Sequence, residues 1–321
     1  RYKKFYNFAL SHQLNNHTTM YLTLKTRLKL VVLIVLLSFF SFGQNNRIYP
    51  PVIDDADVYT YKKVKEVDLK LWVYLPEKKQ IKSTPVIVFF FGGGFRSGSP
   101  QQFTFQSKYF SSRGIASVVV DYRVSSRHGV KPIECVADAK DAIRWIRDHA
   151  KKLNINPSKI ITSGGSAGGY LAAATFFMTT PQNKNIKLTD ERPNALVLFN
   201  PGGMDLSQVS PEKFFNRFGA KKEEANIIAL VQKNAPPTLI LHGDNDKIVN
   251  VNTVRNFTRK MKAFGNNCTL IEYKNQPHGF FNYGRGNNEN YHHTMSAIDS
   301  FLKKIDFLSP FPETYRRRNE Q

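Results

Sequence analysis

The residues Gly164-Gly165-Ser166-Ala167-Gly168 form a G-x-S-x-G sequence that could carry nucleophilic chemistry. A strand-like apolar segment precedes it, and an alanine-rich segment typical of a helix follows it. In a sharp strand-to-helix turn the serine hydroxyl is exposed at the end of the sheet, and flanking glycines relieve backbone crowding. This context predicts that Ser166 is a nucleophile. The alternative is a glycine-rich turn with an incidental serine.

A serine nucleophile needs a base, and the base needs an acid that orients it. Asp246 follows one strand-like apolar run, and His278 follows the next. Because Ser166 also follows a strand-like run, we expect the three side chains at one edge of a sheet. The sequence therefore predicts Ser166 as nucleophile, His278 as base and Asp246 as the orienting acid.

Other residues could take these roles. Asp244 competes with Asp246 for the position of the acid. His242 ends a strand-like run and is expected to be a structural hydrogen-bonding residue. His292 and His293 fall in a late helical segment, where a solvated face is the simpler explanation.

A second glycine-rich loop, Gly92-Gly93-Gly94, directly follows the apolar run that ends at Phe91. Three glycines let the backbone turn sharply and present N–H groups without a Cβ in the way. At the end of a central strand, such a loop can supply an oxyanion hole, worth about 2.7–4 kcal/mol per donor in the transition state. We therefore expect the amides of Gly93, Gly94 and Ala167 to form that hole.

Segments with strand-like and helix-like patterns alternate along the chain. This order predicts an α/β fold, with a mostly parallel central sheet flanked by helices. The segment from Met204 to Asn234 interrupts the alternation and is a candidate for a small helical cap. Strands are expected at Lys65–Leu75 (an edge strand), 86–91, 117–122, 159–163, 195–199, 238–242 and 269–273, and helices at 101–112, 132–153, after Ser166, and at 252–264 and 291–304.

The N-terminal region has the pattern of a targeting signal. After Met20, the residues Lys25, Arg27 and Lys29 precede an apolar run from 30 to 42, which is shorter than the roughly 20 residues of a membrane-spanning helix. We expect a signal peptide within 1–43, cleaved after Gly43, then a catalytic domain over 44–310 and a basic tail over 311–321. This predicts an exported protein, periplasmic or secreted, without a stable membrane span in its mature form.

Composition excludes several classes of protein. The chain has 321 residues, with 41% hydrophobic and 22% charged, which is too apolar for a disordered chain. Its net charge is +21, but no basic helix interleaved with aromatics and no nucleic-acid-binding module accompanies it, so we expect no nucleic-acid partner. Only two cysteines are present, which argues against a disulfide framework and a cysteine-rich zinc site. We expect Cys135 and Cys268 to be free and buried.

The motifs together resemble the α/β-hydrolase superfamily, in its hormone-sensitive-lipase-like and acetyl-xylan-esterase-like branch of carboxylesterases. The resemblance covers about residues 60–305, and the chain order Ser, Asp, His fits it. Where the family's glycine loop usually begins with His, this chain has Phe91. The motifs are the glycine loop, Asp121-Tyr122-Arg123, the run 138–145, the nucleophile turn, Asp246 and His278-Gly279.

The resemblance implies a serine esterase that hydrolyses small-acyl esters. The substrate would be a small ester or an acylated carbohydrate, and polysaccharide deacetylation fits an exported enzyme. Neither a cofactor nor a metal is required by this chemistry. Two alternatives stay open: a serine peptidase of the same fold, and a catalytically silent binding protein.

Overall fold

The computed structural model describes residues 49–77, 83–179 and 191–308. Contacts divide the chain after Tyr49, and the unit described below begins at Pro50. The expected signal segment 1–43 and the expected basic tail 311–321 lie outside the described residues.

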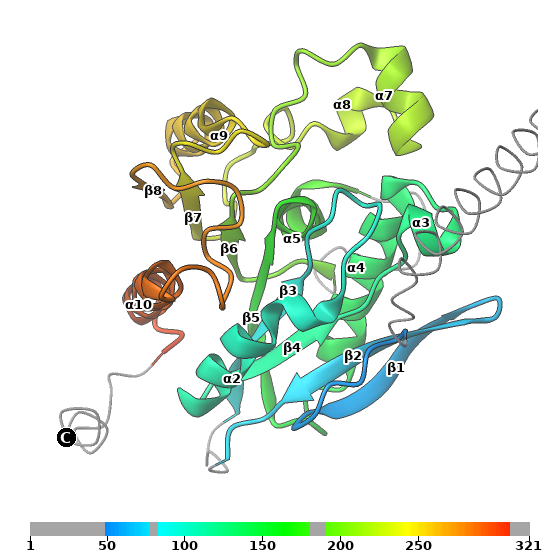
Figure 1. The fold of residues 1–321 in the computed structure, drawn as a ribbon, viewed down its shortest axis with the longest axis vertical. Coiled ribbons are helices and arrows are strands. Elements are labelled where there is room, and N and C mark those ends of the chain that lie inside the picture. Colours follow the sequence, from blue (N-terminus) through cyan, green and yellow to red (C-terminus); the bar gives the residue numbers. More distant parts are fainter. Residues whose placement is uncertain (1–48, 78–82, 180–190, 309–321) are drawn as a thin grey trace, which may run out of the picture. The chain divides into compact units, whose positions relative to one another are not determined.

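One sheet of eight strands organises this unit, in the order β1-β2-β4-β3-β5-β6-β7-β8 (Figure 1). Strand β2 is antiparallel to both β1 and β4, whereas the six strands β4, β3, β5, β6, β7 and β8 are parallel to one another. This confirms the predicted mostly parallel sheet. The strands are β1 (Asp57–Val64), β2 (Val67–Tyr74), β3 (Thr84–Phe90), β4 (Ala116–Val120), β5 (Ile155–Gly165), β6 (Ala195–Phe199), β7 (Thr238–Gly243) and β8 (Cys268–Tyr273).

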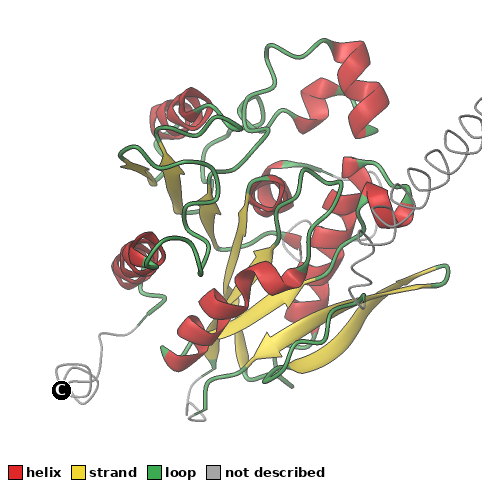
Figure 2. Ribbon diagram, in the orientation of Figure 1, coloured by secondary structure: helices red, strands yellow, loops and turns green. Residues whose placement is uncertain are grey.

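Helices cover both faces of the sheet (Figure 2). Buried side chains of α4, α5 and α9 share one hydrophobic core with the sheet, and those of α2 and α10 share the other. The helices are η1 (Pro100–Phe103), α2 (Thr104–Ser112), α3 (Ser125–His128), α4 (Pro132–Asp148), α5 (Ala167–Phe177), α7 (Pro211–Phe218), α8 (Lys222–Ala225), α9 (Val251–Ala263) and α10 (Glu289–Lys304). None of the described helices is long and apolar enough to cross a membrane.

Strand β3 shows why the central strands read as continuous apolar runs. Val86, Val88 and Phe90 point into the core with α4 and α5. Ile87 and Phe89 point into the opposite core with α2 and α10. Because successive side chains of a strand alternate between faces, a strand covered on both sides needs apolar residues at every position.

The prediction that 65–75 is an edge strand is wrong. Strand β2 lies between β1 and β4, and β1 is the edge. The β1 strand escaped prediction because most of its side chains are solvated and only Tyr61 is buried. A register shift between Thr60 and Lys62 also breaks its alternation.

Two predicted helices have different limits. The segment 101–112 divides into η1 and α2. The helix predicted to reach residue 153 ends at Asp148. Beyond it, the chain turns through Asn154, whose φ of 52° lies outside the helical region and lets β5 begin at Ile155.

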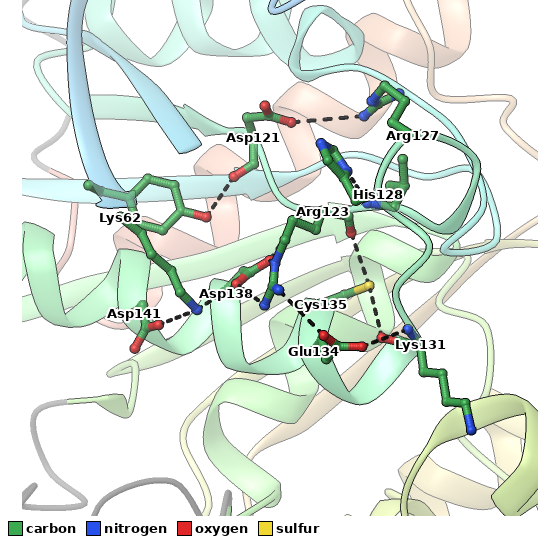
Figure 3. Close-up of polar contacts among 12 residues, drawn as sticks. Lys62, Asp121, Arg123, Arg127, His128, Lys131, Glu134, Cys135, Asp138 and Asp141 are labelled. Atoms are coloured by element: carbon green, nitrogen blue, oxygen red, sulfur yellow. Dashed lines mark hydrogen bonds and ion pairs between the residues drawn. The ribbon is translucent and has the colours of Figure 1, made fainter. Parts of the chain in front are cut away.

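Charged side chains join β1, the end of β4 and α4 (Figure 3). The fully buried carboxylate of Asp138 accepts hydrogen bonds from Lys62 Nζ at 2.6 Å and Arg123 Nε at 2.8 Å. Arg123 also reaches Glu134 at 3.4 Å. A buried carboxylate is tolerated when several charge-assisted hydrogen bonds replace its hydration. This cluster fixes the segment that leaves β4 against α4.

Both cysteines are free and buried, as expected. Cys135 Sγ donates to the Arg123 carbonyl at 3.1 Å. Burial raises the pKa of Cys135 to about 12 and that of Cys268 to about 11, so both are protonated near neutral pH. Neither thiol has the character of a nucleophile.

The segment proposed as a cap carries two helices, α7 and α8, between β6 and β7. Phe218 of α7 packs edge-on against Phe95, with ring centroids 6.2 Å apart, and against Tyr170 of α5, at 5.6 Å. Phe95 follows the glycine loop directly. The segment therefore borders that loop.

Candidate active site

Ser166 occupies the strained turn between β5 and α5. Its φ of 56° and ψ of −118° are unfavourable for a residue with a side chain and cost on the order of 1–3 kcal/mol. Ser166 N donates to Phe199 O at 3.0 Å, and Ser166 O accepts from Tyr170 N at 3.1 Å and Gly202 N at 3.0 Å. These bonds hold the turn in a conformation that presents the side chain at the end of the sheet.

The glycines of this turn are required by close backbone packing. A Cβ atom at Gly164 would lie 2.5 Å from the backbone of Gly168. A Cβ atom at Gly168 would lie 2.0 Å from Phe90 O. Real Cβ atoms do not approach backbone atoms so closely, so the strand and the helix can meet here only through glycine.

Asp246 and His278 form a hydrogen-bonded pair at the same edge of the sheet. Each lies in the loop after a parallel strand, β7 or β8, and the strand ends are aligned across the ladder by Gly165–Phe199, Phe199–Leu241 and Gly243–Tyr273. His278 Nδ1 lies 2.7 Å from Asp246 Oδ2. The other carboxylate oxygen accepts from Ile248 N at 2.8 Å and from Val249 N at 2.9 Å.

This arrangement fixes the tautomer of the imidazole. A carboxylate cannot donate a hydrogen bond, so His278 Nδ1 carries a proton, and in the neutral form of such a ring Nε2 is the basic atom. The His278 side chain is 23% exposed, whereas that of Asp246 is fully buried. Within the described part of the chain, the Ser166 hydroxyl makes no hydrogen bond.

The competing residues make their shortest contacts elsewhere, although His242 Nε2 also lies 3.5 Å from Asp246 Oδ2. Asp244 is exposed and accepts from Asn275 N at 2.6 Å, so it supports the loop before His278. His242 is fully buried, and its Nε2 donates to Val249 O at 3.0 Å. His292 and His293 are exposed on α10. The structural role expected for His242 agrees with its contact.

His242 makes the stability of the protein depend on pH. Burial lowers the pKa of His242, so below about pH 6.5, the value for an unfolded chain, the unfolded state takes up a proton that the folded state does not. Stability contributed by the neutral ring is therefore complete above that pH and is lost as the pH falls. Between about pH 7.5 and pH 5.5, we expect the free energy of unfolding to decrease, by at most about 1.4 kcal/mol per pH unit from this group.

Urea unfolding of the wild type and of His242→Gln at both pH values measures this contribution. The variant is expected to lose less stability on acidification than the wild type. An equal loss in both proteins would show that other groups, such as His128, whose pKa burial also lowers, account for the whole effect.

The glycine loop offers exposed backbone donors. Gly93 and Gly94 have φ values of 123° and 63°, which a residue with a Cβ rarely adopts. Neither N–H donates to another backbone group within the described residues. Ala167 is the first residue of α5, where an N–H has no partner within the helix. The three predicted donors are thus available at the edge that holds Ser166.

Phe91, which replaces the family's usual histidine, is buried in an aromatic stack. Its ring lies on that of Tyr122, with centroids 4.0 Å apart. The Tyr122 hydroxyl donates to Phe91 O at 2.7 Å. Arg127 Nη1 also donates to Gly98 O at 2.9 Å. Arg127 Nη2 lies 3.9 Å from Asp121 Oδ1 (Figure 3). The loop is therefore held by the segment 121–128 that follows β4.

Sequence reasoning missed Asn200, which supports the histidine loop. Asn200 Oδ1 accepts from Gly279 N at 3.1 Å. The residue is fully buried and has a φ of 32°. Its Nδ2 has no partner in the described part of the chain, which is a costly state for a buried donor. Its position directly after the predicted strand 195–199, at the edge that carries the other site residues, is the signal that could have identified it.

Two family models match the chain. The model described as BD-FAE matches residues 71–200, and the model of the dienelactone hydrolase family matches residues 214–311. Both matched segments contain predicted site residues: Ser166 lies in the first, and Asp246 and His278 lie in the second.

Curated relatives and solved structures agree with these matches. The chain is 31% identical to an acetylxylan esterase of Xylanibacter ruminicola, over 72% of this chain and 47% of that protein. It is 26% identical to esterase LipC of Mycobacterium tuberculosis, over 62% of this chain and 54% of that protein. The chain thus spans about half the length of these two relatives.

A solved thermophilic esterase of Thermogutta terrifontis, esterase 2, matches over nearly its whole length. The identity is 44% and the TM-score 0.79, with 83% of this chain and 98% of that chain covered. That esterase has also been solved with bound propionate and phosphonylated by sarin.

Proposed function

Because the chain belongs to the carboxylesterases of the α/β-hydrolase superfamily, we propose that it is a serine esterase that hydrolyses esters of small acyl groups. The observation that carries the proposal is the 2.7 Å contact of His278 with buried Asp246, at the sheet edge that holds the strained Ser166 turn. Strained backbone conformations of this kind cluster at functional sites, where they position a reacting group.

In the proposed reaction, Ser166 Oγ attacks the ester carbonyl carbon as His278 Nε2 takes the hydroxyl proton. Asp246 holds the ring in the required tautomer and stabilises its protonated form. The amides of Gly93, Gly94 and Ala167 bind the carbonyl oxygen as it becomes negative. His278 then gives its proton to the departing alcohol, and water, activated by the same base, releases the acid and regenerates Ser166.

We propose that the substrate is an ester of a small acyl group with a carbohydrate hydroxyl. The propionate complex of the Thermogutta esterase supports the first, and the acetylxylan esterase supports the second. Deacetylation of a polysaccharide outside the cytoplasm also fits the signal-like segment within 1–43, which lies outside the described residues.

Product release from a panel of substrates tests this proposal. We expect the highest kcat/KM for acetyl and propionyl among nitrophenyl esters of increasing chain length, and acetate release from acetylated xylo-oligosaccharides. A preference for medium-length acyl chains would contradict the small acyl group and would indicate lipid substrates. Absence of hydrolysis across the panel would contradict the esterase assignment itself.

A further inference from the structure

Two loops must keep a fixed separation for the proposed reaction: the glycine loop, which carries the oxyanion donors, and the histidine loop, which carries the base. They leave β3 and β8, which are not neighbours in the sheet. We propose that Gln102 and Asn282 form an amide bridge that sets this separation. Both would be positioning residues, and the inference rests on the proposed function.

The bridge is a continuous series of hydrogen bonds. Gly92 N donates to Gln102 Oε1 at 2.6 Å. Gln102 Nε2 donates to Asn282 Oδ1 at 3.0 Å, across 180 positions of the chain. Asn282 Nδ2 donates to Gly279 O at 2.8 Å. The series therefore runs from the backbone next to Gly93 to the backbone next to His278.

The orientation of both amides is dictated by their partners. Gly92 offers an N–H, so the oxygen of Gln102 must face it and the NH₂ group must face Asn282. Asn282 must then turn its oxygen to Gln102 and its NH₂ group to the Gly279 carbonyl. Only this arrangement makes all three hydrogen bonds, so the two amides can specify a single geometry.

Both ends of the bridge are anchored in the core. Gln102 precedes Phe103, and Asn282 follows Phe281; both phenylalanines are buried. Their rings are stacked, with centroids 5.8 Å apart and planes inclined by 11°. The backbone from which each amide extends is therefore fixed by packing, and the bridge transmits this fixed position to the loops.

The loop end of the bridge reaches the nucleophile. A Cβ atom at Gly92 would lie 3.4 Å from Ser166 Cβ and 3.5 Å from Gln102 Oε1, so Gly92 lies beside both side chains. At the other end, Gly279 N is held by Asn200, and His278 O accepts from Arg285 at 3.3 Å. Loss of the bridge would free the oxyanion donors and the base to shift relative to each other.

Paired substitutions test the bridge by its effect on kcat. Gln102→Met and Asn282→Leu keep the volume of each side chain and remove the amide. Because misplacement by about 1 Å can cost about 100-fold in rate, we expect kcat for p-nitrophenyl acetate to fall by about 10- to 100-fold in each, with KM changed less than about twofold. The double variant should be no slower than the slower single variant, since the same bridge is already broken.

Gln101→Met, at the exposed neighbouring position, is the matched control and should keep the wild-type kcat.

Three results would overturn the inference: unchanged kcat in both single variants, losses that multiply in the double variant, or a rise in KM alone. Thermal unfolding of each variant separates positioning from stability, because a purely structural role lowers the Tm while folded protein keeps its kcat. Ser166→Ala separates the two proposals. If that variant stays active, the proposed function fails; if it is inactive while the bridge variants keep kcat, only the bridge fails.

Discussion

Ser166→Ala is expected to lower kcat for p-nitrophenyl acetate by about 10⁵-fold or more and to leave the fold intact. The reason is that the proposed reaction forms its acyl intermediate on the Ser166 hydroxyl, and without it the base has no nucleophile to deprotonate. The loss of the hydroxyl removes no hydrogen bond present in the described part of the chain, and the strained backbone conformation at position 166 is the same in the variant. The Tm should therefore be no lower than that of the wild type. Steady-state kinetics with thermal unfolding measures both.

Ser163→Ala is the matched control for this variant. Ser163 lies three residues earlier in β5, and its buried hydroxyl has no partner in the described part of the chain. We expect its kcat to stay within about threefold of the wild type, since it contacts no reacting group. Undiminished turnover in Ser166→Ala would refute the nucleophile assignment, and a fluorophosphonate probe that still labels that variant would point to another serine.

Asp246→Asn is expected to reduce kcat by about 10⁴-fold through the wrong tautomer of His278. The amide oxygen can keep the two hydrogen bonds from Ile248 N and Val249 N. The NH₂ group must then face His278 Nδ1, which becomes an acceptor, so the ring proton moves to Nε2. A ring protonated at Nε2 cannot take the proton of Ser166.

Asp244→Asn distinguishes this effect from a general loss of acidic charge. Asp244 is exposed, and its partner is Asn275 N rather than an imidazole. We expect kcat within about threefold of the wild type, because the amide oxygen can accept the same hydrogen bond. Equal losses in the two variants would show that Asp246 does not act through His278.

The pattern of the sequence was sufficient for most of the sheet. Strand β6 spans the predicted Ala195–Phe199, and β7 and β8 differ from their predictions by one residue at one end. Strands β6 and β7 are buried along their whole length, so their side chains are mostly apolar and the runs are visible without any knowledge of their partners. Strand β8 lies at the edge of the sheet, with Thr269 and Glu272 exposed, and its enrichment in β-branched and aromatic residues indicated it instead. The solvated strand β1 carries no such signal and was missed.

In helix α4, by contrast, the sequence pattern could not predict which charged side chains are buried. Asp138 and Lys140 would be assigned to its solvated face by their charge, yet both are buried. Asp138 meets Lys62 and Arg123, and Lys140 meets Glu191 at 3.1 Å. Each partner comes from another part of the chain, so no local period or propensity could predict the burial.

By itself, the sequence determined the order of strands and helices, the strand-to-helix turn at Ser166 and the set of residues able to act as base, acid and oxyanion donors. Local spacing is enough for these, because turns and apolar periods involve residues a few positions apart. Tertiary structure alone decided that Asp246 rather than Asp244 meets His278, that Tyr122 supports Phe91, and that Gln102 meets Asn282. Hydrogen bonds between distant segments require placement within a few tenths of an ångström, and only the packing of the core around the sheet provides it.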